Sequence, residues 1–458
     1  MAVVVTAAAF AVACSKDKDS GKITLDSPAV FFAQAGGSAT VGFTAQNIKT
    51  LSATSKPTGW DEAVVDLAGA TISVKAPSAE DIESGDAVKT GSFSFTGYTP
   101  GGTLVSATLF AGIVTTKDIS AEVANSYIVS EPETNYLIDA TRKSDGSLLA
   151  TSYVDVVWQT ASGFVQYADF EDGKASFYIG ADSDDATKIK QGNAVIGAYN
   201  ADDELIWSWH IWATDYDPDA EGGTVVFNDY TLMNRNLGAQ ANDNSTTDKI
   251  LASYGLYYQW GRKDPYRNMA AGSINERPEI NPAWKTVTGN TVYWNDWNIQ
   301  NAWSSWEKRN NYPLCFMYSR TYYDGRDYNW VKYETAPTHY LWFTPKTNFD
   351  PCPAGYRIPT QQEFDVDYTL DDDGNIGFTV VADRQFNPLP AQGYLKFDGT
   401  PRFIGQEVTL WTCQPYATGA GQLGAYNFDY YIGEPSSLTN TDLVNRSFAM
   451  PVRCVKIK

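Results

Sequence analysis

The chain has 458 residues, more than one hydrophobic core usually serves, so its length predicts two or three domains. With 34 Lys and Arg against 54 Asp and Glu it carries a net charge of −20, which repels phosphate and argues against nucleic acid as a partner. Aromatic residues make up 14% of the sequence and charged residues 19%, a balance that favours aromatic-faced sheets over long solvent-facing helices.

The N-terminal segment predicts export and lipid anchoring. Residues 2–13 form an apolar run that is too short to span a bilayer but suits the core of a signal peptide, although no Lys or Arg precedes it. The run ends in Ala11-Val12-Ala13-Cys14, which resembles a lipobox, and residues 15–19 resemble the Lys/acid tag of outer-surface lipoproteins in Bacteroides-type bacteria. We therefore expect a signal peptide over 1–14, lipid on Cys14 and a tether over 15–22. The alternative is a buried N-terminal strand with an incidental cysteine.

Two stretches of alternating residues predict two β-sandwiches. Residues 23–118 contain short runs of period two between Gly-rich turns, which predicts an immunoglobulin-like sandwich of about seven strands. Its pattern resembles the immunoglobulin-like and BACON-type modules of Bacteroides surface lipoproteins, which implies the role of a spacer. Residues 119–221 hold four further strands and predict a second sandwich.

The last strand of the second sandwich, residues 205–212, should be covered on both faces. Trp207, Trp209 and Ile211 share one face, and Ser208, His210 and Trp212 share the other. We therefore expect His210 to be a buried, hydrogen-bonded residue of the sheet rather than a metal ligand.

Residues 222–458 carry four ordered motifs: Thr231–Ala239, Tyr254–Pro265, Asp350–Thr360 and Arg446–Val455. Together they resemble the Fibrobacter succinogenes major paralogous domain, a family found in surface lipoproteins of Bacteroidetes, including fimbrillin-like ones. The resemblance implies a C-type lectin-like α+β fold and an extracellular recognition module. Independently, Thr360 followed by Glu363 predicts the capping-box start of one short helix. The expected fold class is thus mainly β: two sandwiches followed by a lectin-like domain.

Besides Cys14, the chain has four cysteines, all in its last third: Cys315, Cys352, Cys413 and Cys454. An even count in an exported protein predicts disulfides, with three pairings open. No two of them have the close spacing of a zinc site, and the two histidines, His210 and His339, add no ligand spacing. The lectin-like resemblance implies a Cys352–Cys454 bridge from the helix region to the last strand, which leaves Cys315 with Cys413. Pairing of Cys315 with Cys352 or Cys454 is the alternative.

No cofactor is expected, and calcium is the one candidate. The acidic loop Asp215–Glu221 alternates acids as an EF-hand does, but Ala220 stands where Gly is required and Val226 where Glu is required. A solvated interdomain hinge is therefore favoured there, and a plain turn at Asp371–Asp373. The motifs of calcium-dependent sugar-binding lectins are also out of order, since Trp294-Asn295-Asp296 lies far upstream of Cys352.

An aromatic-rich region predicts the ligand-binding surface. It alternates poorly and contains Trp294, Trp297, Trp303, Trp306 and Trp330. Exposed Trp and Tyr side chains can stack on sugar faces or anchor a protein partner. The alternative is that they form the core of a loop-rich insertion.

The sequence offers little for catalysis. Two histidines exclude most His-dependent acid–base schemes, and neither a nucleophile elbow nor a phosphate-binding Gly loop is present. Catalysis by a pair of carboxylates, as in glycosidases, is the one alternative that the sequence leaves open. We expect a non-enzymatic outer-membrane, surface-exposed lipoprotein, an adhesin or fimbria-associated protein that contacts a glycan or protein ligand on host or other cells, with fimbrial subunits as further candidate partners. The alternative is a glycan-binding accessory lipoprotein of a polysaccharide-uptake system.

Overall fold

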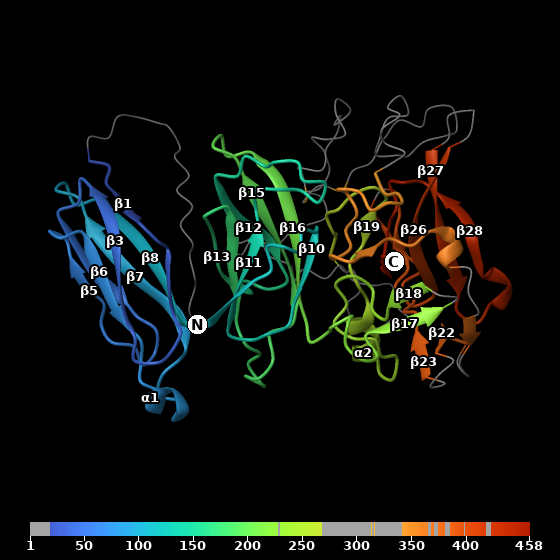
Figure 1. Cartoon of the computed structure of the whole chain (residues 1–458), viewed down its shortest axis with the longest axis horizontal. Coiled ribbons are helices and arrows are strands. Elements are labelled where there is room, and N and C mark those ends of the chain that lie inside the picture. The colour runs from blue at the N-terminus through green and yellow to red at the C-terminus, as the bar shows by residue number, and fades with distance from the viewer. Residues whose placement is uncertain are drawn as a thin grey trace.

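The structure is a computed structural model, and it describes residues 19–227, 230–267, 313, 316, 341–364, 368–370, 374–380, 385–397, 399–417 and 423–458. Within these ranges the chain is mainly β, as predicted, and its few helices are short. Three units lie in a row, with the first sandwich and the C-terminal unit at opposite ends (Figure 1). No helix in these ranges is both long and apolar enough to cross a membrane.

The first unit is a sandwich of two four-stranded sheets, β1-β3-β6-β5 and β2-β8-β7-β4. Its elements are β1 (Lys22–Leu25), β2 (Ala29–Phe32), β3 (Ser38–Gln46), β4 (Thr50–Ser55), β5 (Val64–Asp66), β6 (Thr71–Lys75), α1 (Ala79–Glu83), β7 (Thr90–Tyr98) and β8 (Leu104–Ile113). Alternation along β7 buries Phe93 and Phe95 against Trp60, as period-two strands with one covered face do. Lettered in chain order, the sheets read A-B-E-D and A′-G-F-C, the strand order of immunoglobulin-type sandwiches.

The second unit repeats this strand order in the sheets β13-β14-β11-β9 and β10-β16-β15-β12. Its strands are β9 (Thr115–Asp118), β10 (Ser126–Val129), β11 (Thr134–Asp139), β12 (Tyr153–Gln159), β13 (Val165–Glu171), β14 (Lys174–Ile179), β15 (Gly192–Tyr199) and β16 (Leu205–Ala213). Strand β9 pairs with β11, so this sandwich begins at Thr115, four residues before the expected 119. Only Val114 separates β8 from β9, and the rings of Phe110, Tyr167 and Tyr178 pack together between the two sandwiches.

The third unit is built from short sheets: β17-β18-β30-β20, β19-β29-β24-β25, β21-β22-β23 and β26-β27-β28. Its strands are β17 (Thr224–Phe227), β18 (Tyr230–Met233), β19 (Tyr258–Gln259), β20 (Tyr356–Arg357), β21 (Tyr368–Leu370), β22 (Ile376–Val380), β23 (Gln385–Pro388), β24 (Tyr394–Leu395), β25 (Pro401–Arg402), β26 (Glu407–Ala417), β27 (Leu423–Tyr431), β28 (Thr439–Val444), β29 (Ala449–Met450) and β30 (Val455–Lys456). Its helices are α2 (Thr247–Ser253), η3 (Gln361–Phe364) and η4 (Pro435–Ser437). The helix predicted at Thr360 is η3, a single 3-10 turn in which Thr360 N donates to Glu363 Oε2 at 2.7 Å.

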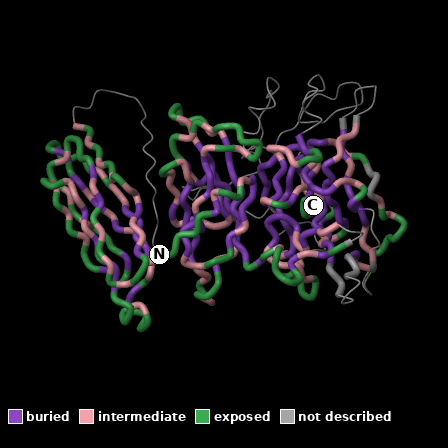
Figure 2. The backbone as a smooth tube through the Cα atoms, viewed as in Figure 1, coloured by how far each residue is buried: buried purple, intermediate pink, exposed green. Residues whose placement is uncertain are grey.

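The second and third units share one hydrophobic core. Val157, Trp158, Val195 and Trp212 of the second sandwich pack in the same cluster as buried residues from all four C-terminal motifs. Figure 2 shows that buried backbone is denser through these two units than in the first. The outer face of the sheet β10-β16-β15-β12 is therefore an interior surface, which is why β16 is buried on both faces, as predicted.

Candidate functional site

Several predicted site residues lie outside the described residues. They are Cys14, Cys315, Trp294, Trp297, Trp303, Trp306 and Trp330, together with the acidic turn Asp371–Asp373. The lipidation site and the tryptophan-rich surface therefore stay predictions.

The structure contains one of the two predicted disulfides. Cys352 and Cys454 are bonded, with their Cα atoms 6.0 Å apart, so this pairing is confirmed. The bridge fastens the segment before β20 to the strand β30, with which β20 pairs. The second pairing is corrected: Cys413 is a free, buried thiol whose Sγ lies 3.9 Å from the Thr344 hydroxyl, while Cys315 lies outside the described residues. An even number of cysteines does not mean that every cysteine forms a disulfide, and here the core encloses Cys413 as a free thiol.

The polar residues around the Asp350–Thr360 motif hold the fold together. Lys346 Nζ donates to the carbonyls of Cys352, Pro353 and Tyr356 at 2.6, 2.7 and 2.7 Å. Asp350 accepts from the backbone N–H groups of Cys352 and Ile358 at 2.8 and 2.9 Å. Because Lys346 and Asp350 are engaged by the backbone of this segment, their role is to hold its fold together next to the disulfide.

A buried polar network crosses from the second unit to the third at His210. Its Nδ1 lies 3.0 Å from the Ser126 hydroxyl, and its Nε2 lies 2.9 Å from Asn193 Oδ1. Asn193 Nδ2 in turn donates to Gly238 O at 3.0 Å, so Oδ1 faces the ring and Nε2 carries the proton. Burial lowers the pKa of His210 to about 3, so the ring is neutral. His210 is thus the satisfied sheet histidine that the sequence predicted.

Further contacts stiffen this junction. Lys263, from the third unit, donates to Ser208 O at 3.0 Å and to Asp264 Oδ1 at 2.7 Å, and it is buried. Trp212 Nε1 donates to Ala239 O at 3.1 Å. Opening this buried interface would break these hydrogen bonds, which costs free energy, so the contacts tie the two units together.

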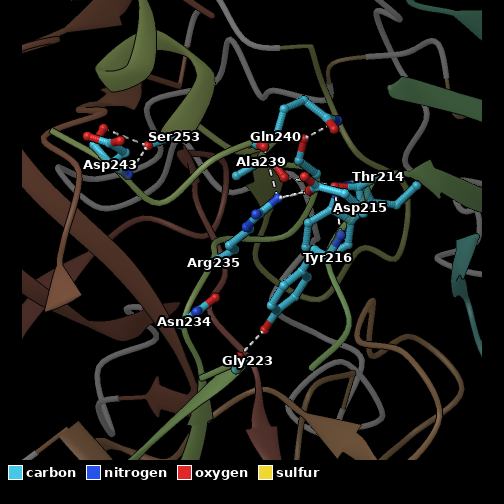
Figure 3. Close-up of polar contacts among 12 residues, drawn as sticks. Thr214, Asp215, Tyr216, Gly223, Asn234, Arg235, Ala239, Gln240, Asp243 and Ser253 are labelled. Carbon is cyan, nitrogen blue, oxygen red and sulfur yellow. Dashed lines mark hydrogen bonds and ion pairs between the residues drawn. The ribbon is translucent and has the colours of Figure 1, made fainter. Parts of the chain in front are cut away.

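The acidic loop after β16 is anchored at both ends rather than a hinge, which corrects the expectation. Figure 3 shows Arg235 reaching across to Thr214 and Asp215 at its start. Arg235 Nη1 donates to Thr214 Oγ1 at 3.2 Å, Asp215 Oδ1 at 3.1 Å and Gln240 O at 2.9 Å. The guanidinium also lies over the Tyr216 ring, 4.9 Å from its centroid, and Tyr216 OH donates to Gly223 O at 2.6 Å (Figure 3).

The middle of the same loop is tied to the C-terminal strand. Asp219 accepts from Lys456 Nζ at 2.6 Å and from Tyr356 OH at 3.2 Å. Among the described residues there is no group of three or more His, Cys, Asp or Glu side chains that could hold a metal ion. Two of the loop carboxylates, Asp215 and Asp219, thus serve as partners for cations of the third unit.

A half-exposed group of rings stands apart from this closed interior. We define the aromatic cluster as Tyr394, Phe397, Phe403, Tyr431 and Phe448. The rings of Tyr394 and Phe448 are nearly parallel, at 16° and 5.5 Å, and Phe403 contacts both Tyr394 and Tyr431. Phe403 is 38% exposed, and the other four rings are of intermediate exposure.

Local backbone geometry presents this cluster. Gly393, at φ +63°, enters β24 so close to the facing strand that a Cβ would clash with Arg402 O. Phe403 has φ +51°, a left-handed conformation that is unusual for a bulky side chain. Sequence reasoning missed this surface because its rings come from strands β24 and β27, the turn after β24 and the residues beside β25 and β29. Only the close spacing of Tyr394, Phe397 and Phe403 hinted at it.

Comparisons with known proteins give no family. A scan against protein-family models found no match, and neither did a search of curated proteins. Among solved structures the chain is similar to the endo-fucoidan hydrolase MfFcnA9 of glycoside hydrolase family 107, at 9% identity over 41% of this chain and 32% of that one, with a TM-score of 0.14. It is similar to the tandem Ig repeats of Dlar (11% identity, 43% and 98% covered, TM-score 0.16) and to SGBP-B of the Bacteroides ovatus mixed-linkage glucan utilization locus (12% identity, 41% and 43% covered, TM-score 0.12). TM-scores of this size carry no argument about family or function.

Proposed function

We propose that this protein is a non-enzymatic recognition protein of the bacterial outer surface that binds its ligand through the aromatic cluster of its C-terminal unit. A lipid on Cys14 anchors it, and the first sandwich spaces the binding unit from the membrane. Its role is adhesive or fimbria-associated. The observation that carries the proposal is the half-exposed aromatic cluster around Phe403, in a unit whose other large rings are mostly buried among the residues that the structure describes.

Exposed rings that already pack against one another suit binding. Their positions are set before the ligand arrives, so little side-chain entropy is lost when it binds. Aromatic side chains in such positions dominate the free energy of many interfaces. The left-handed conformation of Phe403 costs about 1–3 kcal/mol, and such strain clusters at binding sites because function retains it there.

The rigid junction supports the same role. The C-terminal unit shares its core with the second sandwich, so a ligand bound at the aromatic cluster is held on a stiff support rather than on a swinging domain. We further propose that the C-terminal unit has the C-type lectin-like fold of the Fibrobacter succinogenes major paralogous domain. The Cys352–Cys454 bridge agrees with that assignment.

The test compares binding by the Tyr394→Ala/Phe403→Ala variant and by the parent chain, both made without lipid. We expect the variant to bind host cells or arrayed glycans at least about tenfold more weakly, the loss typical of aromatic anchors. Tyr98→Ala is the matched control, because Tyr98 is a 46% exposed ring on β7 of the first unit. Melting temperatures show whether each variant folds.

The proposal fails if the folded double variant binds as the parent does, or if Tyr98→Ala weakens binding equally. For the anchor, Cys14→Ala should remove the protein from the outer surface of intact cells, as judged by surface labelling. Unchanged labelling would contradict the lipoprotein assignment without touching the binding site.

A further inference from the structure

We infer that the ligand of the aromatic cluster is an anionic polysaccharide, whose carboxylate or sulfate groups bind Lys396 and Arg402 while its sugar rings stack on Tyr394 and Phe403. This inference rests on the proposed function, since it names the ligand class of the same site.

The register of the β24–β25 hairpin places the two cations beside the rings. Tyr394 is directly opposite Arg402, and Lys396 follows Tyr394 by two residues, so all three belong to one face of the hairpin. Leu395 is fully buried on the opposite face. The outer face of the hairpin therefore combines an aromatic ring with two positive charges.

Neither cation is neutralised by a carboxylate in the part of the chain that the structure describes. Lys396 Nζ lies over the Phe397 ring, 4.8 Å from its centroid, and Arg402 Nη1 donates to Pro401 O at 3.1 Å. Several other cations of this unit pair with a carboxylate, as Arg357 does with Glu363 at 2.6 Å. In a chain with a net charge of −20, two cations that no described carboxylate pairs, next to half-exposed rings, form a local surface complementary to an anion.

The carboxylates that the structure describes beside Tyr431 are buried rather than exposed next to the two cations. Glu407 and Asp429 both interact with Tyr431, whose pKa is raised by burial and by these carboxylates. However, Glu407 is only 3% exposed and Asp429 only 8%, so both are turned away from solvent. Asp398, in the turn of the hairpin, lies outside the described residues. Repulsion from the rest of the acidic chain is screened beyond about 8 Å at physiological ionic strength.

The ring geometry favours a polysaccharide over an acidic protein segment. Tyr394 and Phe448 are nearly parallel, at 16° with their ring centroids 5.5 Å apart, and Phe403 packs against Tyr394, so the rings form an apolar surface whose geometry is set in advance. The C–H faces of pyranose rings stack on such surfaces while their charged groups reach to the side, where Lys396 and Arg402 lie. An acidic peptide would satisfy the cations but offers no flat apolar faces in regular repeat.

The experiment measures binding of the full chain, made without lipid, to polygalacturonate, dextran sulfate, uncharged dextran and poly-glutamate by affinity electrophoresis at low and high salt. We expect binding to at least one of the two charged polysaccharides and a weaker affinity at high salt. Lys396→Gln/Arg402→Gln should weaken this binding at least about tenfold. The control Lys22→Gln/Lys49→Gln removes the same charge from exposed positions of the first unit and should change little.

Each contrary outcome overturns the inference. The inference is wrong if the chain binds neither charged polysaccharide, or if the control variant loses as much affinity as Lys396→Gln/Arg402→Gln. It is also wrong if poly-glutamate binds as tightly as the polysaccharides, which would indicate an acidic protein partner. A further outcome separates the two proposals. If uncharged dextran or another ligand binds through Phe403 but Lys396→Gln/Arg402→Gln has no effect, the aromatic site stands and the anionic ligand is wrong. Melting temperatures of all variants exclude misfolding as the cause.

Discussion

Acidification should weaken the junction between the second and third units through His210. This ring is 1% exposed, and burial lowers its pKa from 6.5 to about 3. The unfolded chain therefore binds a proton that the folded chain cannot accept between these two pH values. Stability is fully present above pH 6.5, falls as the pH falls below 6.5, and levels off near pH 3.

The size of the effect follows from the two pKa values. Between pH 7 and pH 4.5 the unfolded state gains about 2.5 kcal/mol from protonation at this one site, and the folded state gains almost nothing. The free energy of unfolding of the parent chain should fall by about that much from this source, in addition to the effect of its carboxylates.

Urea denaturation at both pH values, on the parent and on His210→Gln, isolates the contribution. The glutamine cannot titrate, so the variant should lose about 2.5 kcal/mol less than the parent between pH 7 and pH 4.5, although it starts from a lower stability. Carboxylate effects are common to both proteins and cancel in the comparison. If the free energy of unfolding falls equally in the two proteins, the claim that His210 is buried and neutral is wrong.

Three further predictions concern the C-terminal unit. Cys352→Ser/Cys454→Ser opens a bridge that spans 102 residues, so urea denaturation should show a loss of about 2–5 kcal/mol, and a loss below about 1 kcal/mol would contradict a stapling role. Burial raises the pKa of the Cys413 thiol to about 12, so iodoacetamide at pH 8 should label this thiol only in denaturant. Labelling of the native chain within minutes would show instead that the thiol is accessible. Arg235→Ala removes three hydrogen bonds and a ring contact, and it should lower the free energy of unfolding in urea by about 1–3 kcal/mol. The control Lys188→Ala, whose ion pair with Asp185 is exposed, should lower it by less than about 0.5 kcal/mol. Equal losses in the two variants would mean that Arg235 does not anchor the loop.

Local patterns predicted what depends on neighbours in the chain. The alternation of residues indicated both sandwiches, and the polar and aromatic faces of β16 indicated a strand covered on both sides. The capping pair Thr360 and Glu363 marked the one turn of η3. These features are set by side-chain period and by hydrogen bonds within a few residues, so a single sequence contains them.

Among the features that depend on distant contacts, the Cys352–Cys454 bridge was predicted only through the resemblance to a known family, and the following ones were not predicted. Nothing near Cys413 in the chain indicates that the core encloses its thiol, so parity assigned it a bridge that is not formed. The acidic loop was expected to be a hinge because its cationic partners, Arg235 and Lys456, lie 20 and 237 residues away from Asp215 and Asp219 in the chain. The aromatic cluster likewise gathers rings as far apart in sequence as Tyr394 and Phe448.

Footprinting of the bound chain would test the central claim most directly. Hydroxyl-radical oxidation, read by mass spectrometry with and without a saturating ligand-bearing cell extract or glycan, reports which side chains the ligand covers. The proposed site predicts protection of Tyr394, Phe403 and Tyr431, while Tyr98 of the first unit and Tyr153 of the second, both at least 36% exposed, stay reactive. Protection that leaves the aromatic cluster unchanged and falls elsewhere on the chain would contradict the account.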